Sequence, residues 1–387
     1  MLHKTYLGLP GPTPVPERVQ RAMQQPMINH RGPVFKEIFQ DVVTGMKAVF
    51  NTTTADILTY PSSGTGVMEA GIVNLFSPGD CVLVLSVGNF GDRLAEIATS
   101  YGLNVEKVSV ADGQAINLQD LQVRLATDVE HKIKGILFTH NETSTGVTND
   151  VKAVMQVCKN HPAIKMIDTV SALGAVELKM DEWGVDVAVS GSQKALMLPP
   201  GLAFVAFGPR AWEAYKTSTL PKYYWDAGKV KKSLEKRETP YTPPVSLFYG
   251  AQEALKMIAE EGLENIYARH EFLKKMVDSA VTAMGLELLA DPQYASTVVT
   301  SVKMPVGINA KDVQVKMRDV YGITIAGGQK HLEGKILRLA HLGYVTASDM
   351  LVMLGFLEVV LQQLGHKFTF GAGIQAAQKI ILEANNE

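Results

Sequence analysis

Lys194 has the sequence position of a reactive amine. It follows the apolar run Val185–Ser190 through a turn of small residues, and Pro199-Pro200-Gly201 interrupts regular structure soon afterwards. Small residues let backbone and ligand approach closely. A lysine enclosed by apolar strands loses its proton more easily and becomes a usable nucleophile. Taken alone, however, a lysine is most often a surface residue. A catalytic role for Lys194 is therefore predicted only if other residues of the same site can be identified.

Asp168 is the first such residue. It ends the apolar run Ile164–Asp168, and in open α/β sheets ligands bind at the carboxyl ends of the strands. Alone, this aspartate could equally serve a helix cap or a turn. An aspartate for a pyridinium nitrogen, together with a lysine for an aldehyde, is the pairing that pyridoxal 5'-phosphate (PLP) sites need. The pair Asp168 and Lys194 therefore predicts a PLP site.

A candidate phosphate site lies earlier in the chain. The segment Pro61-Ser62-Ser63-Gly64-Thr65-Gly66 stands directly before a helical pattern. Backbone N–H groups and the helix dipole at such an N-terminus bind phosphate. An ordinary Ser/Thr helix cap explains the same residues, and the sequence leaves both interpretations open.

Arg338 lies inside an apolar run, Lys335–Gly343, near the C-terminal end of the chain. An arginine there is costly unless it is paired, and its guanidinium binds carboxylates through two parallel hydrogen bonds. A structural ion pair is one explanation. If this segment faces the cofactor, Arg338 is instead a candidate for binding the substrate carboxylate.

Composition narrows the class of protein. The 387 residues are 46% apolar and 20% charged, with a formal net charge of −2, and no basic patch predicts a nucleic-acid or membrane partner. Cys81 and Cys158 are the only cysteines, so a reducing compartment fits best. No apolar run reaches membrane-spanning length, and the first residues lack the apolar region of a signal peptide. We expect a cytoplasmic globular protein.

Two domains and an N-terminal arm are expected. Residues 1–20 are rich in proline and glycine and predict an extended arm. From there to about residue 260, nearly continuous apolar runs alternate with amphipathic stretches, which is typical of a mostly parallel sheet covered by helices on both faces. The expected strands are Cys81–Ser86, Ile133–Thr139, Ile164–Asp168, Val185–Ser190 and Leu202–Phe207, and the expected helices include Val67–Phe76 and Val151–Lys159.

The pattern changes after about residue 260. Leu263–Met284 has the periodicity of one long helix, short strands are expected near Leu286–Leu289, Thr297–Lys303 and Ile336–Leu339, and Ala347–Leu364 is expected as the closing helix. The sequence thus predicts a large domain over 21–260 and a smaller α+β domain over 261–387.

These segments resemble the class V, fold-type I PLP-dependent aminotransferases, and among them the alanine–glyoxylate / serine–pyruvate aminotransferase family. The resemblance covers nearly the whole chain, and the lysine segment is its most specific part. Its pieces are Gly11-Pro12-Thr13-Pro14-Val15-Pro16, Ser63-Gly64-Thr65, Gly88-Asn89-Phe90-Gly91, His140-Asn141-Glu142-Thr143-Ser144-Thr145-Gly146, Asp168-Thr169-Val170-Ser171, Ser190-Gly191-Ser192-Gln193-Lys194, Thr242-Pro243-Pro244-Val245 and the Arg338 segment.

The resemblance implies a role for each matching residue. Lys194 would hold the cofactor as a Schiff base, and Asp168 would bind the pyridine nitrogen. Val170 would pack on one face of the ring, and Thr143 would hydrogen-bond near its phenolic oxygen. The phosphate would be held by Ser63, Gly64, Thr65 and Gln193. Thr242 would reach the phosphate of the neighbouring subunit's cofactor, which implies a homodimer, and Arg338 would bind the substrate carboxylate.

Two positions depart from the family's pattern. The ring-stacking residue is usually tryptophan, whereas here it is Phe90, which keeps a π-face but lacks the indole N–H. A tyrosine that contacts the phosphate in the family is Thr239 here, and Tyr241 is a possible substitute. These changes put the affinity for the cofactor in question.

The expected activity is amino-group transfer from a small amino acid, alanine or serine, to a 2-oxo acid, glyoxylate or pyruvate, by a ping-pong mechanism. Phosphonate-, phosphoserine- and ureidoglycine-directed aminotransferases remain alternatives, and the first two would need further cations such as Arg31 or Lys330. A cysteine desulfurase-like lyase is less favoured, since both cysteines precede residue 160. A non-catalytic subunit of the same fold is disfavoured because a scaffold does not require a buried lysine.

Overall fold

A seven-stranded sheet forms the larger part of the computed structural model, which describes residues 5–384. Its strand order is β2-β10-β9-β8-β5-β3-β4. The strands are β2 (Asp56–Tyr60), β3 (Cys81–Ser86), β4 (Asn104–Ser109), β5 (Ile133–Thr139), β8 (Ile164–Asp168), β9 (Val187–Gly191) and β10 (Ala203–Phe207). All neighbouring pairs from β9 to β4 are parallel, whereas β10 is antiparallel to both of its neighbours. The predicted mostly parallel sheet is confirmed.

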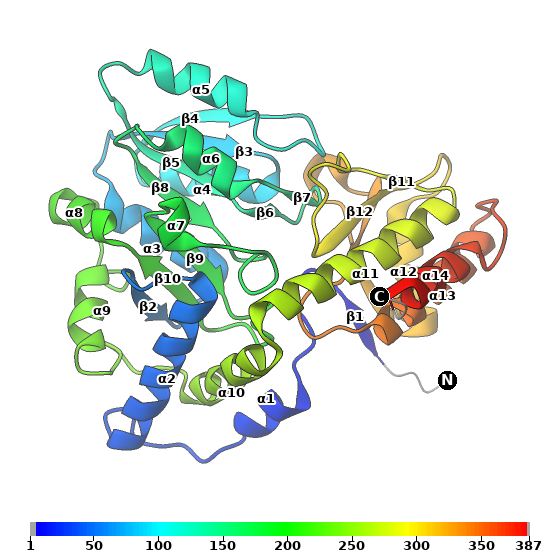
Figure 1. Cartoon of the computed structure of the whole chain (residues 1–387), viewed down its shortest axis with the longest axis horizontal. Coiled ribbons are helices and arrows are strands. Elements are labelled where there is room, and N and C mark those ends of the chain that lie inside the picture. Colours follow the sequence, from blue (N-terminus) through cyan, green and yellow to red (C-terminus); the bar gives the residue numbers. More distant parts are fainter. Residues whose placement is uncertain (1–4, 385–387) are drawn as a thin grey trace.

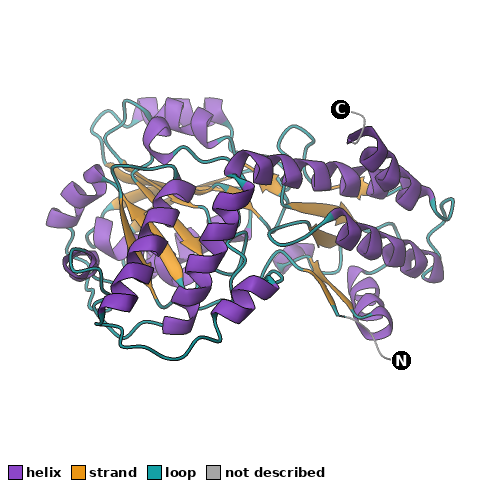
Figure 2. Ribbon diagram, turned by 60° about the horizontal axis from the view of Figure 1, so that its bottom comes forward, coloured by secondary structure: helices purple, strands orange, loops and turns teal. Residues whose placement is uncertain are grey.

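Helices cover both faces of this sheet (Figures 1 and 2), which explains why its inner strands are apolar throughout. One face packs against α2 (Pro33–Phe50), α5 (Leu118–Thr127), α6 (Val151–Cys158), α7 (Met180–Trp183) and α10 (Val245–Glu261). The other packs against α3 (Gly64–Leu75), α4 (Asn89–Ser100), α8 (Pro209–Thr217) and α9 (Ala227–Leu234). The edge strand β4 differs from the inner strands because several of its positions are exposed. Neither β4 nor β2 was predicted from the sequence.

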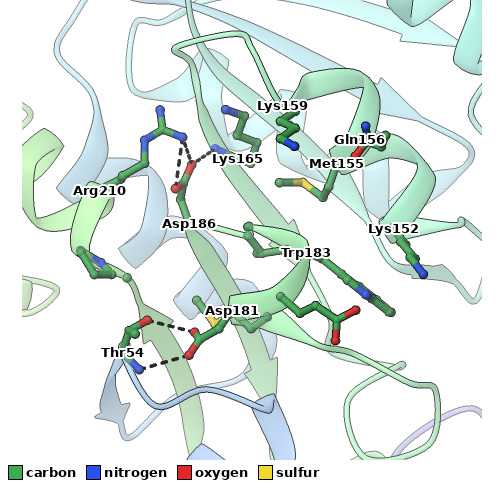
Figure 3. Close-up of a pocket in the computed structure, with 16 residues that line it drawn as sticks. Thr54, Lys152, Met155, Gln156, Lys159, Lys165, Asp181, Trp183, Asp186 and Arg210 are labelled. Atoms are coloured by element: carbon green, nitrogen blue, oxygen red, sulfur yellow. Dashed lines mark hydrogen bonds and ion pairs between the residues drawn. The ribbon is translucent and has the colours of Figure 1, made fainter.

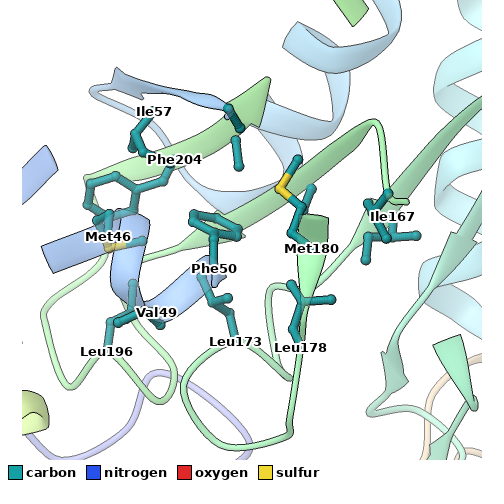
Figure 4. Packing of buried hydrophobic residues seen from close by; sticks show 14 of the residues in the cluster. Met46, Val49, Phe50, Ile57, Ile167, Leu173, Leu178, Met180, Leu196 and Phe204 are labelled. Carbon is teal, nitrogen blue, oxygen red and sulfur yellow. The ribbon is translucent and has the colours of Figure 1, made fainter. Parts of the chain in front are cut away.

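The core under the sheet also fixes the chain next to Lys194. Figure 4 shows Phe50 of α2 among buried residues that include Phe204 of β10 and Leu196. Phe50 and Phe204 are 0% exposed and Leu196 is 2% exposed. Because Leu196 lies two residues after Lys194, its burial anchors the turn that carries the lysine.

A second sheet of five strands, in the order β1-β13-β14-β12-β11, forms the smaller body. Its strands are β1 (Tyr6–Gly8), β11 (Glu287–Leu288), β12 (Val299–Lys303), β13 (Ile323–Gly327) and β14 (Ile336–Ala340), and its helices are α11 (Leu263–Ala283), α12 (Ala310–Tyr321), α13 (Ala347–Gln363) and α14 (Ala372–Ala384). The expectation that α13 closes the chain is wrong, because α14 follows and packs against α11. The strand β13 and the helix α12 were also not predicted.

The N-terminal arm joins the two bodies. β1 pairs in parallel with β13, so Tyr6–Gly8 completes the smaller sheet, while residues 1–4 of the expected arm lie outside the described residues. The extended segment ends at Pro16, because α1 (Glu17–Ala22) begins there and packs against α10. Gly262 separates α10 from α11 with a φ of 82°, and α11 then leads into the smaller body (Figure 1). We propose residue 260/261 as the domain boundary.

Among residues 5–384, no helix is both long enough and apolar enough to cross a membrane.

Candidate functional site

Lys194 lies in the turn after β9, beneath the N-terminal arm. The backbone N–H of Thr13 donates to Gln193 O (3.2 Å), and the hydroxyl of Thr13 donates to Lys194 O (2.8 Å). The Nζ of Lys194 donates to Pro10 O. Gly11, with a φ of +124°, passes so close that a Cβ there would overlap Nζ. Burial lowers the pKa of Lys194 to about 8, and the nearby charge of Arg338 acts in the same direction.

Asp168 lies at the carboxyl end of β8, with Val189 of β9 opposite it in the parallel register. Its side chain is 4% exposed, and its Oδ1 accepts the backbone N–H of Val170 (2.8 Å). Burial raises the pKa of Asp168 to about 7, and the carboxylate of Glu142 raises it further. The parallel pairing brings Asp168 and the Lys194 turn to the same edge of the sheet, where the sequence analysis placed them.

The N-terminus of α3 is open. Ser63 is the N-cap residue, yet its side chain makes no capping hydrogen bond, so the interpretation as an ordinary helix cap is wrong. A Cβ on Gly64 would lie 2.6 Å from Cγ2 of Val170, which explains the glycine. A Cβ on Gly191 would lie 3.2 Å from Gly64 N and 2.8 Å from Gln193 Oε1. Gln193 Oε1 is buried without a hydrogen-bond partner among the described residues.

Two residues to which the sequence analysis gave no role hold the region around Phe90. The carboxylate of Glu142, 0% exposed, accepts the backbone N–H groups of Phe90 and Gly91 (both 3.0 Å). The guanidinium of Arg93 lies 4.7 Å from the centre of the Phe90 ring and donates to Thr65 Oγ1 (3.2 Å). The available signals were an acidic residue three positions after the end of the apolar strand β5 and an arginine one turn into the α4 helix.

Arg338 of β14 is 7% exposed. It donates to the carbonyl oxygens of Gly327 (2.7 Å) and Thr143 (3.2 Å). No carboxylate of the described chain lies within ion-pair distance of its guanidinium, so the explanation as a structural ion pair is wrong. Burial lowers its pKa to about 10, partly offset by the charge of Glu142. The bond to Thr143 joins the smaller sheet to the loop between β6 (Asn141–Glu142) and β7 (Val147–Thr148).

The structure does not bring Thr242 to this group. Thr242 is exposed, just before α10, and makes no hydrogen bond or ion pair with the site residues described above. The hydroxyl of Thr239 donates to Tyr241 O (2.7 Å), and the hydroxyl of Tyr241 donates to Tyr223 O (3.1 Å). These hydrogen bonds hold the hydroxyl groups of Thr239 and Tyr241 on other backbone carbonyls of the same chain. Neither bond connects these residues to the N-terminus of α3.

The arrangement combines four chemical capacities in one place. An amine of lowered pKa, Lys194, stands beside a buried carboxyl group, Asp168. The open N-terminus of α3 can accept an anion, and the guanidinium of Arg338, which lacks an acidic partner, can accept a carboxylate.

The comparisons with known proteins agree with this geometry. The model of the family "Aminotransferase class-V" matches residues 5–351. The chain is 45% identical over 386 residues to a protein of Synechococcus sp. (strain PCC 6716) named soluble hydrogenase, small subunit, covering 99% of this chain and 100% of that protein. It is 39% identical over 382 residues to L-aspartate–glyoxylate aminotransferase of Paracoccus denitrificans (strain Pd 1222), covering 98% and 96%.

Among solved structures, ureidoglycine–glyoxylate aminotransferase from Bacillus subtilis superposes with a TM-score of 0.92 at 29% sequence identity, covering 99% of both chains. The fold is therefore that of a fold-type I aminotransferase. The family match and these relatives identify the chain as a member of the class V aminotransferases, which are PLP-dependent transaminases.

Proposed function

We propose that Lys194 binds PLP covalently and that Asp168 binds its pyridine nitrogen. The observation that carries this proposal is the placement of both side chains at neighbouring strand ends, beside the open N-terminus of α3. The buried, unpartnered Oε1 of Gln193 and the space kept by Gly64 fit a phosphate held by Ser63, Gly64, Thr65 and Gln193. The ring would then lie between Val170 and Phe90, with Thr143 near its phenolic oxygen.

When bound, PLP supplies an electron sink for the carbanion formed at the substrate's α-carbon. The chain's own residues do the rest. Arg338 would orient the substrate carboxylate. The freed Nζ of Lys194 would remove the α-proton as general base and pass it on within the same half-reaction, so that the amine is neutral again when the oxo acid binds and the sequence runs in reverse. Asp168 keeps the ring nitrogen protonated, because an anionic partner favours the cationic form. The arm over Lys194 excludes water from the reacting atoms.

For substrates, we propose alanine or serine as the amino donor and glyoxylate or pyruvate as the acceptor. The aminotransferases of Paracoccus and Bacillus named above share glyoxylate in their names and differ in the donor, which supports the acceptor more than the donor. The donor is inferred from this chain. Pro10 and Gly11 lie directly against Nζ of Lys194, which leaves little room for a long side chain.

Half-reaction spectra test this proposal. The PLP-loaded enzyme is mixed with one amino donor and no acceptor, and the loss of the visible band is followed with alanine, serine, aspartate, glutamate and aminoethylphosphonate. We expect conversion with alanine or serine at rates well above those with the other three. Faster conversion with aspartate or glutamate would overturn the small-donor assignment, and no conversion with any amine would overturn the transaminase mechanism.

Arg338→Gln is expected to weaken the binding of every carboxylate substrate. A hydrogen bond to a charged group contributes about 1.5–3 kcal/mol, so KM for both the amino donor and the oxo acid should rise about 10- to 100-fold. The absorbance of bound PLP should stay unchanged, because Arg338 is not proposed to touch the cofactor. An unchanged KM for both substrates would contradict the assignment, and Lys311→Gln on the exposed side of α12 is the control.

The rate at which the cofactor-free protein takes up PLP should depend on pH through Lys194. Only the neutral amine attacks an aldehyde, and burial lowers the pKa of Lys194 from 10.5 to about 8. The uptake rate should therefore rise about tenfold per pH unit below 8 and level off above it. Stopped-flow absorbance between pH 6.5 and 9.5 measures this. A rate that still climbs tenfold per unit at pH 9.5 would mean that Lys194 is not in its buried state.

We also propose that the enzyme is a homodimer in which Thr242 reaches the partner's cofactor phosphate. Two observations support this: Thr242 is exposed, and within the described residues it makes no hydrogen bond to the site of its own chain. A solution mass of two chains is expected. Both cysteines are free, which supports the proposal of a reducing, cytoplasmic location. Cys158 is buried and Cys81 belongs to strand β3, so neither supports the mobile catalytic thiol that a desulfurase needs.

The phosphate-directed alternatives are less well supported. Arg31 is bonded to Glu238 (2.7 Å) and to Thr239 O. Lys330 pairs with Glu96 (3.3 Å) and lies 3.6 Å from Asp92. Both cations that could have bound a substrate phosphate therefore already have acidic partners.

A further inference from the structure

A cavity of about 500 Å³ lies on the opposite side of the large sheet from Asp168 and Lys194, where the parallel strand β8 begins. Figure 3 shows it between α6 and the α7 segment, with Arg210 at one end. Lys165 lines it from the start of β8, three residues before Asp168 on the same strand. At about 3.3 Å per residue the two side chains are about 10 Å apart along the strand. Because Lys165 and Asp168 lie near opposite ends of β8, this cavity is separate from the site described above.

The main anomaly in this cavity is Lys165. It is only 2% exposed, and its Nζ donates to one neutral acceptor, the carbonyl oxygen of His161 (2.6 Å). No carboxylate of the described chain lies within ion-pair distance of this Nζ. The nearby Asp186 instead accepts the backbone N–H of Lys165 (2.8 Å) and pairs with Arg210 (3.2 Å). Burying an ammonium group without a counter-charge costs free energy. An anion bound in the cavity would reduce this cost by pairing with Lys165.

Two more cations line the same cavity. Lys152 lies in the first turn of α6 and Lys159 is its C-cap residue, still in a helical backbone conformation, and a spacing of seven residues places both on one side of the helix. Neither makes an ion pair with a residue in the described range. Together with Lys165 and Arg210 they give the cavity four cationic side chains.

The cavity's carboxylates do not balance these cations. Asp181 is fully engaged, since its oxygens accept from Thr52, Thr53 and Thr54 at 2.6–3.2 Å. Asp186 is held by Lys165 N and Arg210. Glu182 is exposed and lies 4.0 Å from Lys179. The lining has four cationic and three anionic side chains, since Asp181 keeps its charge when neutral threonines donate to it, so the formal balance is one positive charge.

The remaining wall is apolar and carries an unused donor. Met155, Met180 and Trp183 line the cavity, and the indole Nε1 of Trp183 is buried without a hydrogen-bond partner in the described chain. An indole face with thioether side chains suits a flat ring. The cavity's volume is within the range of small-molecule sites.

From these contacts we propose that this cavity binds an organic phosphate: a phosphoryl group held by Lys165, Arg210 and Lys159, and a flat ring with a hydrogen-bond acceptor held against Trp183. The site lies outside the transamination chemistry and does not depend on the proposed function.

The test uses the PLP-loaded enzyme, so that the cofactor's own phosphate site is already filled. AMP, ADP and inorganic phosphate are titrated by calorimetry, with Trp183 fluorescence as a second readout. Because Trp212 and Trp225 also emit, the Trp183→Phe enzyme supplies the background. We expect one AMP or ADP per chain, an affinity at least tenfold tighter than for inorganic phosphate, and weaker binding as salt is raised.

Variants separate this site from others. Lys165→Met removes the charge at nearly constant volume, and Lys159→Gln alters only an exposed position. Each should weaken nucleotide binding at least tenfold, whereas Lys311→Gln should not. If Lys165→Met does not fold, Lys159→Gln and Trp183→Phe carry the test. The proposal is overturned if neither nucleotide binds at millimolar concentration, if inorganic phosphate binds equally well, or if Lys159→Gln binds as the wild type does.

Discussion

Lys194→Ala is expected to give a folded protein that binds PLP only non-covalently and no longer transaminates. Two effects add. The cofactor loses its covalent attachment, and the α-proton loses its base, which alone should cost about 10²- to 10⁴-fold in kcat. Folding should be preserved, because within the described residues Nζ of Lys194 donates a hydrogen bond only to Pro10 O in the arm, and the anchoring residue Leu196 is untouched.

Three measurements check this prediction. Reduction with borohydride, followed by mass spectrometry, should label the wild-type chain at Lys194 and leave the alanine variant unlabelled. Dialysis should strip PLP from the variant faster than from the wild type. Lys311→Ala, an exposed lysine of α12, is the matched control for loss of a lysine. If Lys194→Ala transaminated at the wild-type rate, the whole site assignment would fail.

Asp168→Asn is expected to fold and to bind PLP, but to lose about 10²- to 10³-fold in kcat. The substitution is mild for the fold, because burial raises the pKa of Asp168 to about 7 and an amide oxygen can still accept the Val170 N–H. It is severe for catalysis, because asparagine brings no negative charge to hold the ring nitrogen protonated, and the electron sink weakens.

The pH profile distinguishes this electrostatic role from a merely structural one. In the wild type, the anionic form of Asp168 is the one that pairs with a cationic ring. Acid should therefore reduce kcat as that carboxylate is protonated, and Asp168→Asn should remove this acidic limb while leaving the melting temperature nearly unchanged. Asp150→Asn, an exposed N-cap residue of α6 where asparagine caps equally well, is the control. Retention of the acidic limb in Asp168→Asn would sink the assignment.

Glu142 connects these predictions to the rest of the fold. It holds the N–H groups of Phe90 and Gly91 and raises the pKa of Asp168, while it partly offsets the effect of burial on Arg338. A single buried carboxylate thus holds the backbone of Phe90, the residue proposed to stack on the ring, and contributes to the pKa values of Asp168 and Arg338. The substitution of phenylalanine for the usual tryptophan occurs on a backbone that is held firmly in place.

Local sequence determined much of this protein. The continuous apolar runs fixed β3, β5 and β8 to the residue, because a strand buried on both faces cannot alternate with polar positions. Because ligands of open α/β sheets bind at the carboxyl ends of the strands, the sequence alone predicts Asp168 and Lys194 at one edge of the sheet. The short strand β1 and the half-exposed strand β4 lacked such a pattern and were not predicted. β2, which is buried at four of its five positions, was also not predicted.

Only the tertiary structure decided which partners each functional group has. Arg338 and the residues of the α3 N-terminus each had two interpretations in the sequence, and the choice depended on whether a carboxylate or a capping hydroxyl lay within reach. Lys165 lies within the predicted strand Ile164–Asp168, and only the packing shows that its side chain is buried without a counter-charge among the described residues. The reason is physical. The periodicity of a segment indicates which of its faces is buried. The hydrogen-bond partners of Lys194 and Arg338 instead lie 184 and 195 residues away in the sequence, and they meet only when the chain is packed.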